Sequence, residues 1–299
     1  MSEVMMPEEA AELTPPTRAL IRDLARAART LSPFEARYLV DLYYTLQRQR
    51  IRAGNQARAA SESGEPHEAI AFYLQQFAAL ERSIRKVLDH YTESQPLSSW
   101  ARGIVGIGPV IAAGLLSHVT REQRHVGQLW SFAGLSPANV WKPGQKRPWN
   151  ARLKVICYHA GESFIKTQHA EGSYYGPIFR RYRERLEQMN EAGAFAAKAA
   201  EALQLKKWRD GTIARAAYEA GRYPDARLHA DARRRTVKVF LCHYWTVSWW
   251  LRTGHMPPTR PYVFEMLGHD GASYVPAPNT DCLGGFREAE RRWMAGEQT

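Results

Sequence analysis

Apolar residues recur at helical spacing along most of the chain, and few stretches alternate in the way that strands do. Residues 32–35 (Ser-Pro-Phe-Glu) form a capping box with proline at the first helical position, and four-residue apolar steps follow. We therefore expect a helix over 33–60, and similar patterns predict helices over 17–30, 151–166, 178–190 and 239–251. The pattern predicts a mainly α protein: a helical hairpin or coiled-coil arm followed by a helical domain.

Residues 67–91 form the most regular segment of the chain. Two apolar rows run along it at heptad spacing: Ile70, Phe77, Ile84 and Tyr91, and three positions later Tyr73, Leu80 and Val87. Such rows are typical of an a/d seam. Three heptads are short for a free coiled coil, so we expect this helix to pack on helix 33–60 as a hairpin. The same two helices can also pair with a second copy of the chain as a homodimer.

A glycine-rich turn stands near residue 107, between two apolar helical stretches. Gly106 and Gly108 flank Ile107, so the backbone there can take positive φ, and Pro109 suits the first turn of a helix. Free main-chain amides at 106–108, together with the helix start at Val110, would form an anion site. This arrangement resembles a helix-hairpin-helix, whose amides grip a DNA phosphate. The alternative is a glycine turn between packed helices, without a ligand.

A basic loop follows over residues 141–150. Lys142, Lys146 and Arg147 lie between two tryptophans, and Arg152 and Lys154 follow on the next predicted helix. A basic loop with aromatic neighbours can hold phosphates and stack on bases or sugars, so we expect all five cations to contact DNA. A surface loop pinned by its two tryptophans is the alternative.

The far end of helix 33–60 is also basic. It carries Arg48, Arg50, Arg52 and Arg58 beside several glutamine and asparagine residues. This end can lie along a nucleic-acid backbone, or it can be an ordinary solvated helix end.

The net charge of the 299-residue chain is +11, which favours a polyanionic partner, most often nucleic acid. DNA is the expected partner and structured RNA an open one, whereas a basic but ordinary protein is the alternative. No apolar run reaches membrane-spanning length and no signal peptide opens the chain, so we expect no membrane partner.

Three cysteines are spread along the chain. Cys157, Cys242 and Cys282 are odd in number and far apart, so they predict no disulfide framework and favour a reducing cytoplasm. Cys157 and Cys242 stand beside His159 and His243, but the spacing matches no structural zinc pattern. We expect these residues in the core, and we expect no bound metal or cofactor.

With these landmarks, the middle of the chain resembles the C-terminal transposase domain of the IS110/IS116/IS902 family. The match covers roughly residues 65–252, with an extra segment at about 190–230. The segments that carry it are the helix that ends in Leu80–Val87; Ile104–Leu116, which is similar to "PGIGPVTAAALLAE"; Leu129–Pro137, similar to "LAAYAGLAP"; the basic loop and helix over 144–166; Ser173–Arg185; and Arg235–Leu241. The resemblance implies a helix-hairpin-helix domain that acts on DNA in transposition or recombination.

Two departures from that family matter. Residues 1–64 are too short and too helical for its N-terminal RuvC-like nuclease domain, whose four acidic residues hold metal. Lys142-Pro-Gly stands where the family has its serine nucleophile, and Ser131 and Ser136 do not match that position. We therefore expect a DNA-binding protein without recombinase chemistry and without catalytic residues. An active transposase, and an interaction protein that uses the heptad arm, are the alternatives.

The domain organisation follows from these segments. We expect a disordered acidic tail over 1–14, a helical arm over 15–94 and the helix-hairpin-helix domain over 95–252. Beyond residue 252 the chain is rich in proline and glycine, so we expect an extended tail over 253–299.

Overall fold

The computed structural model describes residues 23–63, 68–261 and 274–297. Within these ranges the chain is mainly helical and contains no strand, which confirms the predicted mainly α fold. The helices fall into two compact units. Unit 1 takes in the chain up to residue 102 together with 108–120, and unit 2 takes in 103–107 together with the chain from 121 onward.

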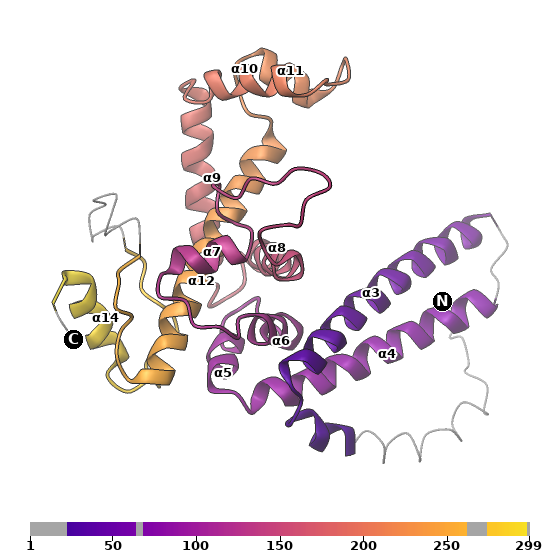
Figure 1. Cartoon of the computed structure of the whole chain (residues 1–299). Helices are drawn as coiled ribbons and strands as arrows, with labels where there is room; N and C mark the ends of the chain where they lie inside the picture. Colours follow the sequence, from indigo (N-terminus) through magenta and orange to yellow (C-terminus); the bar gives the residue numbers. More distant parts are fainter. Residues whose placement is uncertain (1–22, 64–67, 262–273, 298–299) are drawn as a thin grey trace. The chain divides into compact units, whose positions relative to one another are not determined.

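Unit 1 is built on two long antiparallel helices, α3 (Pro33–Glu62) and α4 (Glu68–Glu93), which we call the arm (Figure 1). The predicted capping box opens α3: the Ser32 hydroxyl accepts from the Glu35 amide, and the Glu35 carboxylate accepts from the Ser32 amide. This reciprocal pair satisfies two amides that a helix start otherwise leaves unpaired.

An ion pair joins the two helices of the arm. Arg50 Nε donates to Glu81 Oε2 at 2.6 Å, and the Glu81 side chain is largely buried. Burial opposes ionisation of Glu81, but the hydrogen bond and charge of Arg50 outweigh it and hold the pKa of that carboxyl below its usual value. The pair therefore stays charged at neutral pH and fixes the register between α3 and α4.

Two shorter helices, α5 (Pro96–Arg102) and α6 (Pro109–His118), also belong to unit 1, as does a helical segment over 23–28. The α6 helix packs on both α3 and α4. Arg37 Nε donates to the Ser117 carbonyl oxygen at 2.7 Å, which fastens the start of α3 to the end of α6.

The core of unit 1 lies where α3, α4 and α6 meet. Val40, Leu88 and Leu115 are each at most 1% exposed there. Beyond Val40, no described residue of α3 is buried. The second half of α3 therefore projects past this core as part of a two-helix hairpin.

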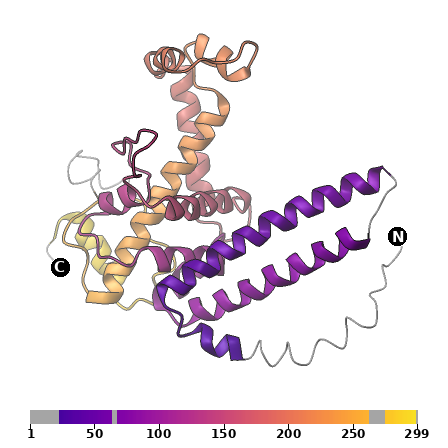
Figure 2. The same ribbon diagram turned by 45° about the vertical axis from the view of Figure 1, so that its right-hand side comes forward.

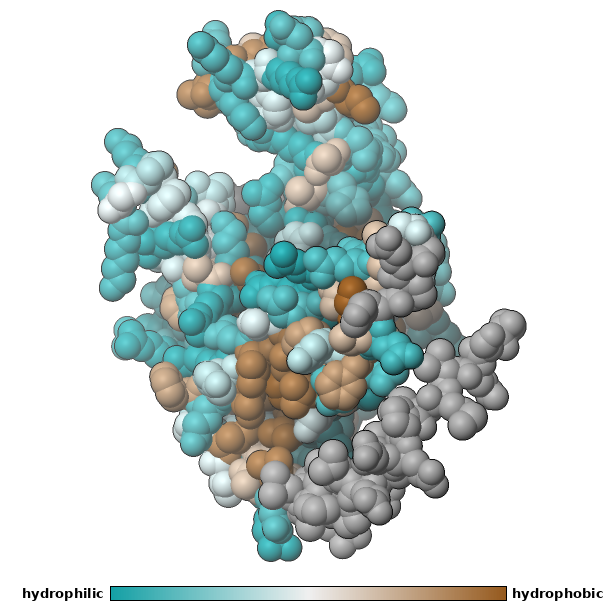
Figure 3. All heavy atoms as spheres, turned by 90° about the vertical axis from the view of Figure 1, so that its right-hand side faces the viewer, coloured by the Kyte–Doolittle hydropathy of each residue, from teal (hydrophilic) through white to brown (hydrophobic). Residues whose placement is uncertain are grey.

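The heptad segment packs only partly as predicted. Glu81, Ile84 and Leu88 are buried. The helix α4 therefore packs through the first heptad row, which contains Ile84, and through the positions four residues after that row. In the second row, Tyr73 is 60% exposed and Leu80 is 51% exposed. The prediction of a complete a/d seam against α3 is therefore wrong. Figure 3 shows hydrophobic side chains gathered on part of the face that it draws.

Unit 2 is organised around one long helix, α12 (Asp225–Thr253), which begins well before the predicted helix 239–251. Three helices pack against it: α7 (Val126–Phe132), α8 (Ala151–Lys166) and α9 (Tyr175–Glu191). Asn150 caps α8 as its sequence predicts, because the Asn150 side chain accepts hydrogen bonds from two amides of the first turn. None of the described helices has both the length and the hydropathy needed to cross a membrane.

Aromatic side chains fill the core between α8, α9 and α12. The rings of Phe164 and Tyr175 stack with centroids 4.5 Å apart, and Phe240 meets both edge-on. The Tyr175 hydroxyl lies 2.8 Å from His243 Nδ1, and His243 Nε2 lies 2.7 Å from the Val275 carbonyl oxygen. A carbonyl oxygen only accepts, so Nε2 carries the hydrogen and Nδ1 accepts from the tyrosine. Burial lowers the pKa of His243 to about 4, which keeps the ring neutral.

Residues within about 190–230, where we expected an extra segment, form a small lobe with its own core. Helices α10 (Ala196–Leu205) and α11 (Ile213–Glu219) lie together at the end of α9 and the start of α12 (Figures 1 and 2). The rings of Phe195 and Tyr223 stack there with centroids 4.4 Å apart, and Tyr218 is buried beside them.

The C-terminal part is not the extended tail that we expected. Helix α14 (Phe286–Ala295) buries three residues of one face: Phe286, Glu290 and Trp293. Trp293 Nε1 donates to the Pro257 carbonyl oxygen at 2.9 Å. The spacing of four and then three residues is helical, but the proline and glycine content around it hid this signal.

The predicted domain limits differ from the two units. We expected a boundary between residues 94 and 95, whereas the chain leaves unit 1 after residue 102 and returns to it over 108–120. The acidic segment 1–14 lies outside the described residues.

Candidate nucleic-acid interface

The glycine-rich turn is partly used by the protein itself. The Ile107 amide donates to the Ile104 carbonyl oxygen at 2.9 Å, and the Gly106 carbonyl oxygen accepts from Ser163 Oγ at 2.6 Å. Gly106 has a φ of +100°, and a Cβ there would lie 3.1 Å from Thr167 Oγ1. The expectation of a free amide at Ile107 is therefore wrong, because the turn closes on itself and packs against α8.

Gly108 and Val110 belong to unit 1. Gly108 precedes α6 with φ −88° and ψ 175°, so it does not take the positive φ that we expected. A Cβ on Gly108 would meet no other described atom within 4 Å. Val110 is 7% exposed and belongs to the core. The boundary between the units falls between Ile107 and Gly108, so the predicted phosphate grip is divided between them.

The segment 136–150, which contains the basic loop, is anchored at both ends. Near its start, Asn139 Nδ2 donates to the Ser131 carbonyl oxygen and Ser131 Oγ donates to Asn139 Oδ1, both at 2.8 Å. At its end, the Asn150 amide donates to the Phe132 carbonyl oxygen at 2.8 Å. The loop is thus fixed to the end of α7 and the start of α8.

Two tryptophans of this region each hold a cation. Trp141 Nε1 donates to the Gln145 carbonyl oxygen at 2.7 Å, and the Arg147 guanidinium carbon lies 5.3 Å from the Trp141 ring centroid. Lys154 Nζ lies 4.6 Å from the Trp149 ring centroid. These are cation–π distances, so two of the five predicted cations are held in place without a carboxylate.

The other three predicted cations are exposed on the same stretch of chain. Lys142 and Lys146 lie on the loop, and Arg152 lies on the first turn of α8. The structure therefore places all five on one short segment, between α7 and the first turn of α8.

The middle of α12 adds a cation cluster beside Trp130 of α7. Lys238 Nζ lies 4.3 Å from the Trp130 ring centroid, and Trp130 Nε1 donates to the Lys238 carbonyl oxygen at 3.0 Å. Burial lowers the pKa of Lys238, and the positive charges of Arg235 and Arg234 lower it further. Like charges thus stand near one another on α12.

A similar pair joins α8 to α12. The Arg233 guanidinium carbon lies 4.2 Å from the Tyr158 ring centroid, and Arg233 also forms an ion pair with Glu162. Tyr158 is 48% exposed. Its ring is therefore available at the surface on the same helix as Arg152 and Lys154.

Together these residues form what we call the basic–aromatic surface of unit 2. Its members are Trp130, Trp141, Trp149, Tyr158, Lys142, Lys146, Arg147, Arg152, Lys154 and Lys238. Residues 123–161, which supply all but Lys238, contain six Lys or Arg and no Asp or Glu. A surface with this composition attracts polyanions, and its two exposed rings, Trp141 and Tyr158, can stack on flat groups.

The glycine turn and the basic loop do not meet as one site. The turn contacts Ser163 and Thr167, near the end of α8, whereas the loop joins α8 at its start. Lys154 and Ser163 are nine residues apart, which is about 13 Å along a helix. The cations that we expected to surround the turn therefore belong to a separate surface.

The cysteines and the serine considered as candidate functional residues have structural surroundings. Cys157 and Cys242 are buried and unpaired, and burial raises the pKa of each thiol to about 12. Ser131 is hydrogen-bonded to Asn139. Among the described residues, no three His, Cys, Asp or Glu side chains come together in a group that could hold a metal ion.

The sequence patterns did not predict that Trp130, Tyr158 and Lys238 belong to the basic–aromatic surface. A signal was present, because Arg234 and Arg235 precede Lys238 by four and three residues and so share a helix face with it. Nothing local in the sequence pairs Lys238 with Trp130, from which 108 residues separate it.

Comparisons of this chain with family models, with curated protein sequences and with solved structures find no match.

Proposed function

We propose that the protein binds DNA through the basic–aromatic surface of unit 2. Its cations hold the phosphate backbone, and its exposed rings stack on bases or sugars. One observation carries the proposal: residues 123–161 have no carboxylate and fold so that their loop cations are exposed, with Arg147 and Lys154 standing over indole rings.

Two physical properties of the surface support the proposal: its cluster of positive charges and the cation–π contacts that hold some of these cations in place. Like charges that gather without counter-charges attract an anion, and each neutralised phosphate releases bound counterions. Cation–π contacts contribute about 0.5–1 kcal/mol each at exposed sites. They also restrict the cations before binding, which lowers the entropy lost on association.

DNA is chosen over RNA because of the resemblance to the IS110-type transposase C-terminal domain. That resemblance is itself part of the proposal, as is the absence of recombinase chemistry in this chain. Pairing of two copies through the arm belongs to it as well, supported by the exposed side chains of Tyr73 and Leu80. A cytoplasmic setting is supported by three cysteines that remain unpaired.

The experiment is a fluorescence-anisotropy titration of the full chain with a labelled DNA duplex, a DNA single strand and an RNA hairpin, at about 50 mM salt. We expect binding to DNA, and we expect replacement of Lys142, Lys146 and Arg147 by glutamine to weaken it about tenfold or more. Failure to bind any of the three at low salt would overturn the proposal, and tighter binding to the hairpin would replace DNA by RNA.

A matched control removes the same charge from another part of unit 2. Lys198, Lys206 and Lys207 are exposed in the α10–α11 lobe, and Lys206 Nζ lies 4.4 Å from the Trp208 ring centroid. Replacing these three by glutamine lowers the net charge equally. We expect this variant to retain most of the affinity, because its changes lie outside the basic–aromatic surface.

A further inference from the structure

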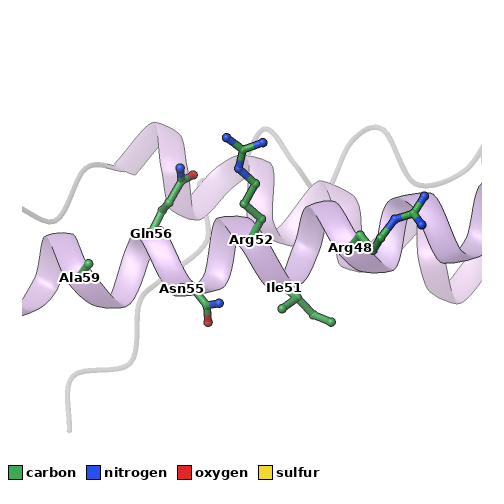
Figure 4. A pocket seen from close by; sticks show the side chains of 6 residues that line it. All are labelled: Arg48, Ile51, Arg52, Asn55, Gln56 and Ala59. Atoms are coloured by element: carbon green, nitrogen blue, oxygen red, sulfur yellow. The ribbon is translucent and has the colours of Figure 1, made fainter. Parts of the chain in front are cut away.

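The second half of α3 presents one continuous exposed face, which we call the outer face of α3 (Figure 4). It comprises Arg48, Ile51, Arg52, Asn55, Gln56 and Ala59, all exposed, at spacings of three and four residues. Such spacing keeps side chains on one side of a helix over three turns. The outer face runs about 16 Å from its first residue to its last.

The charge of this face is unusual for a solvated helix. Two of the four arginines within residues 42–61, Arg48 and Arg52, lie on this face, and residues 42–61 contain no Asp or Glu. Arg48 and Arg52 stand four residues apart, where like charges destabilise a helix by a few tenths of a kcal/mol. Solvated helices ordinarily alternate charges along such a face. The face therefore carries an arrangement that helix stability alone does not favour.

The opposite side of the same helix shows how an arginine is used for structure. Arg50 points to α4 and pairs with Glu81 at 2.6 Å. Arg48 and Arg52 are two residues away on either side, which is about 200° around the helix axis. Their guanidinium groups consequently face away from α4, and Arg48 Nη2 donates to the hydroxyl of its helix neighbour Thr45 at 3.3 Å.

We infer that the outer face of α3 enters the major groove of duplex DNA and contacts base edges. An α-helix with its side chains is about 10–12 Å wide, and the B-form major groove is about 12 Å wide. Arginine matches guanine, asparagine and glutamine match adenine, and the methyl groups of Ile51 and Ala59 suit the thymine methyl. The face thus combines positive charge with the side chains that read sequence.

This inference concerns unit 1 and uses none of the residues of the basic–aromatic surface. The two surfaces have different chemistry. Removing loop cations that hold phosphates weakens binding to all duplexes alike. Removing amides that read base edges changes the preference among DNA sequences. Affinity and preference therefore test the two proposals separately.

The test selects duplexes from a randomised DNA pool with the full chain, then measures affinity for the selected sequence and for a scrambled one. We expect a clear preference, and protection of guanine N7 in the selected site from dimethyl sulfate, because N7 lies in the major groove. Replacing Asn55 and Gln56 by alanine should reduce the preference about tenfold or more, while the affinity for scrambled duplex stays unchanged.

Matched controls lie on α4. Gln75 and Gln76 are exposed amides, and their replacement by alanine should leave the preference intact. Alanine also favours helix, so circular dichroism should show both variants folded. A wild-type chain that binds duplexes without preference would overturn the inference and leave the proposed function standing. An Asn55→Ala/Gln56→Ala variant that keeps the full preference would overturn it as well.

Discussion

Trp130 and Lys238 hold each other at two points: the indole Nε1 donates to the Lys238 carbonyl oxygen at 3.0 Å, and the Lys238 ammonium lies 4.3 Å from the centroid of the indole ring. The first contact joins α7 to α12. The second places a positive charge beside α7. One tryptophan thus contributes both to the packing of unit 2 and to the position of a cation on its proposed DNA-binding surface.

Trp130→Phe should keep an aromatic ring, although a smaller one, and lose the indole N–H with its hydrogen bond. We expect a loss of about 1 kcal/mol in the free energy of unfolding, or a few degrees in melting temperature. Trp141→Phe is the control, since its indole bonds to Gln145 within an exposed loop. Thermal melting followed by circular dichroism checks both, and equal losses would contradict the assigned role of Trp130.

Gly106→Ala should destabilise unit 2. Gly106 has a φ of +100°, which side chains disfavour by about 1–2 kcal/mol, and an added Cβ would press on Thr167 and Phe164 at 3.1 and 3.2 Å. Gly108→Ala is the matched control, because Gly108 has a negative φ and open space at its Cβ position. Urea unfolding should show a clearly larger loss for Gly106→Ala, and the reverse order would show that the turn is packed differently.

His243 should make the stability of unit 2 depend on pH. Its folded-state pKa of about 4 lies below the ordinary value of 6.5, so between these values the unfolded chain takes up a proton that the folded chain does not. The free energy of unfolding should therefore fall as the pH is lowered, by about 2 kcal/mol at pH 5. Burial raises the pKa of Glu290. Through this group the free energy of unfolding falls as the pH rises, which is opposite to the effect of His243.

His243→Gln isolates the histidine contribution. Its amide can accept from Tyr175 and donate to Val275, but it does not titrate. Urea midpoints at pH 7 and pH 5 should differ less for this variant than for the wild-type chain. An unchanged difference would show that other groups cause the pH dependence.

The exposed heptad row predicts an effect on association. Tyr73 and Leu80 leave apolar surface uncovered on α4, and a second copy of the arm can bury it. Sedimentation velocity should show a dimer for the wild-type chain and a monomer for Tyr73→Lys/Leu80→Lys, with unchanged helicity. A wild-type chain that stays monomeric at tens of micromolar would contradict pairing through this row.

Local signals in the sequence predicted much of the fold. The Ser32–Glu35 capping box and the Asn150 cap act within four residues, so the helix starts that they mark could be predicted. The heptad rows were visible too, but which row would be buried depends on where α3 and α6 pack. Helix α14 was missed because its short apolar face stands among proline and glycine residues.

The clustering of the five cations could be predicted for the same reason. The five cations of the loop and α8 are neighbours in sequence, and the structure keeps them together. The glycine turn was misjudged because the use of its polar groups depends on Ser163, which lies 57 residues from Gly106. The pairing of Trp130 with Lys238 likewise depends on tertiary packing, which a local pattern does not contain.

The salt dependence of DNA binding tests the central claim most directly. Titrations of a labelled duplex between about 50 and 200 mM salt should give a steep linear fall of log affinity with log salt. Replacing Lys142, Lys146 and Arg147 by glutamine should reduce that slope by roughly two to three, one for each lost phosphate contact. An unchanged slope in this variant, or a wild-type chain that binds no DNA at low salt, would contradict the account.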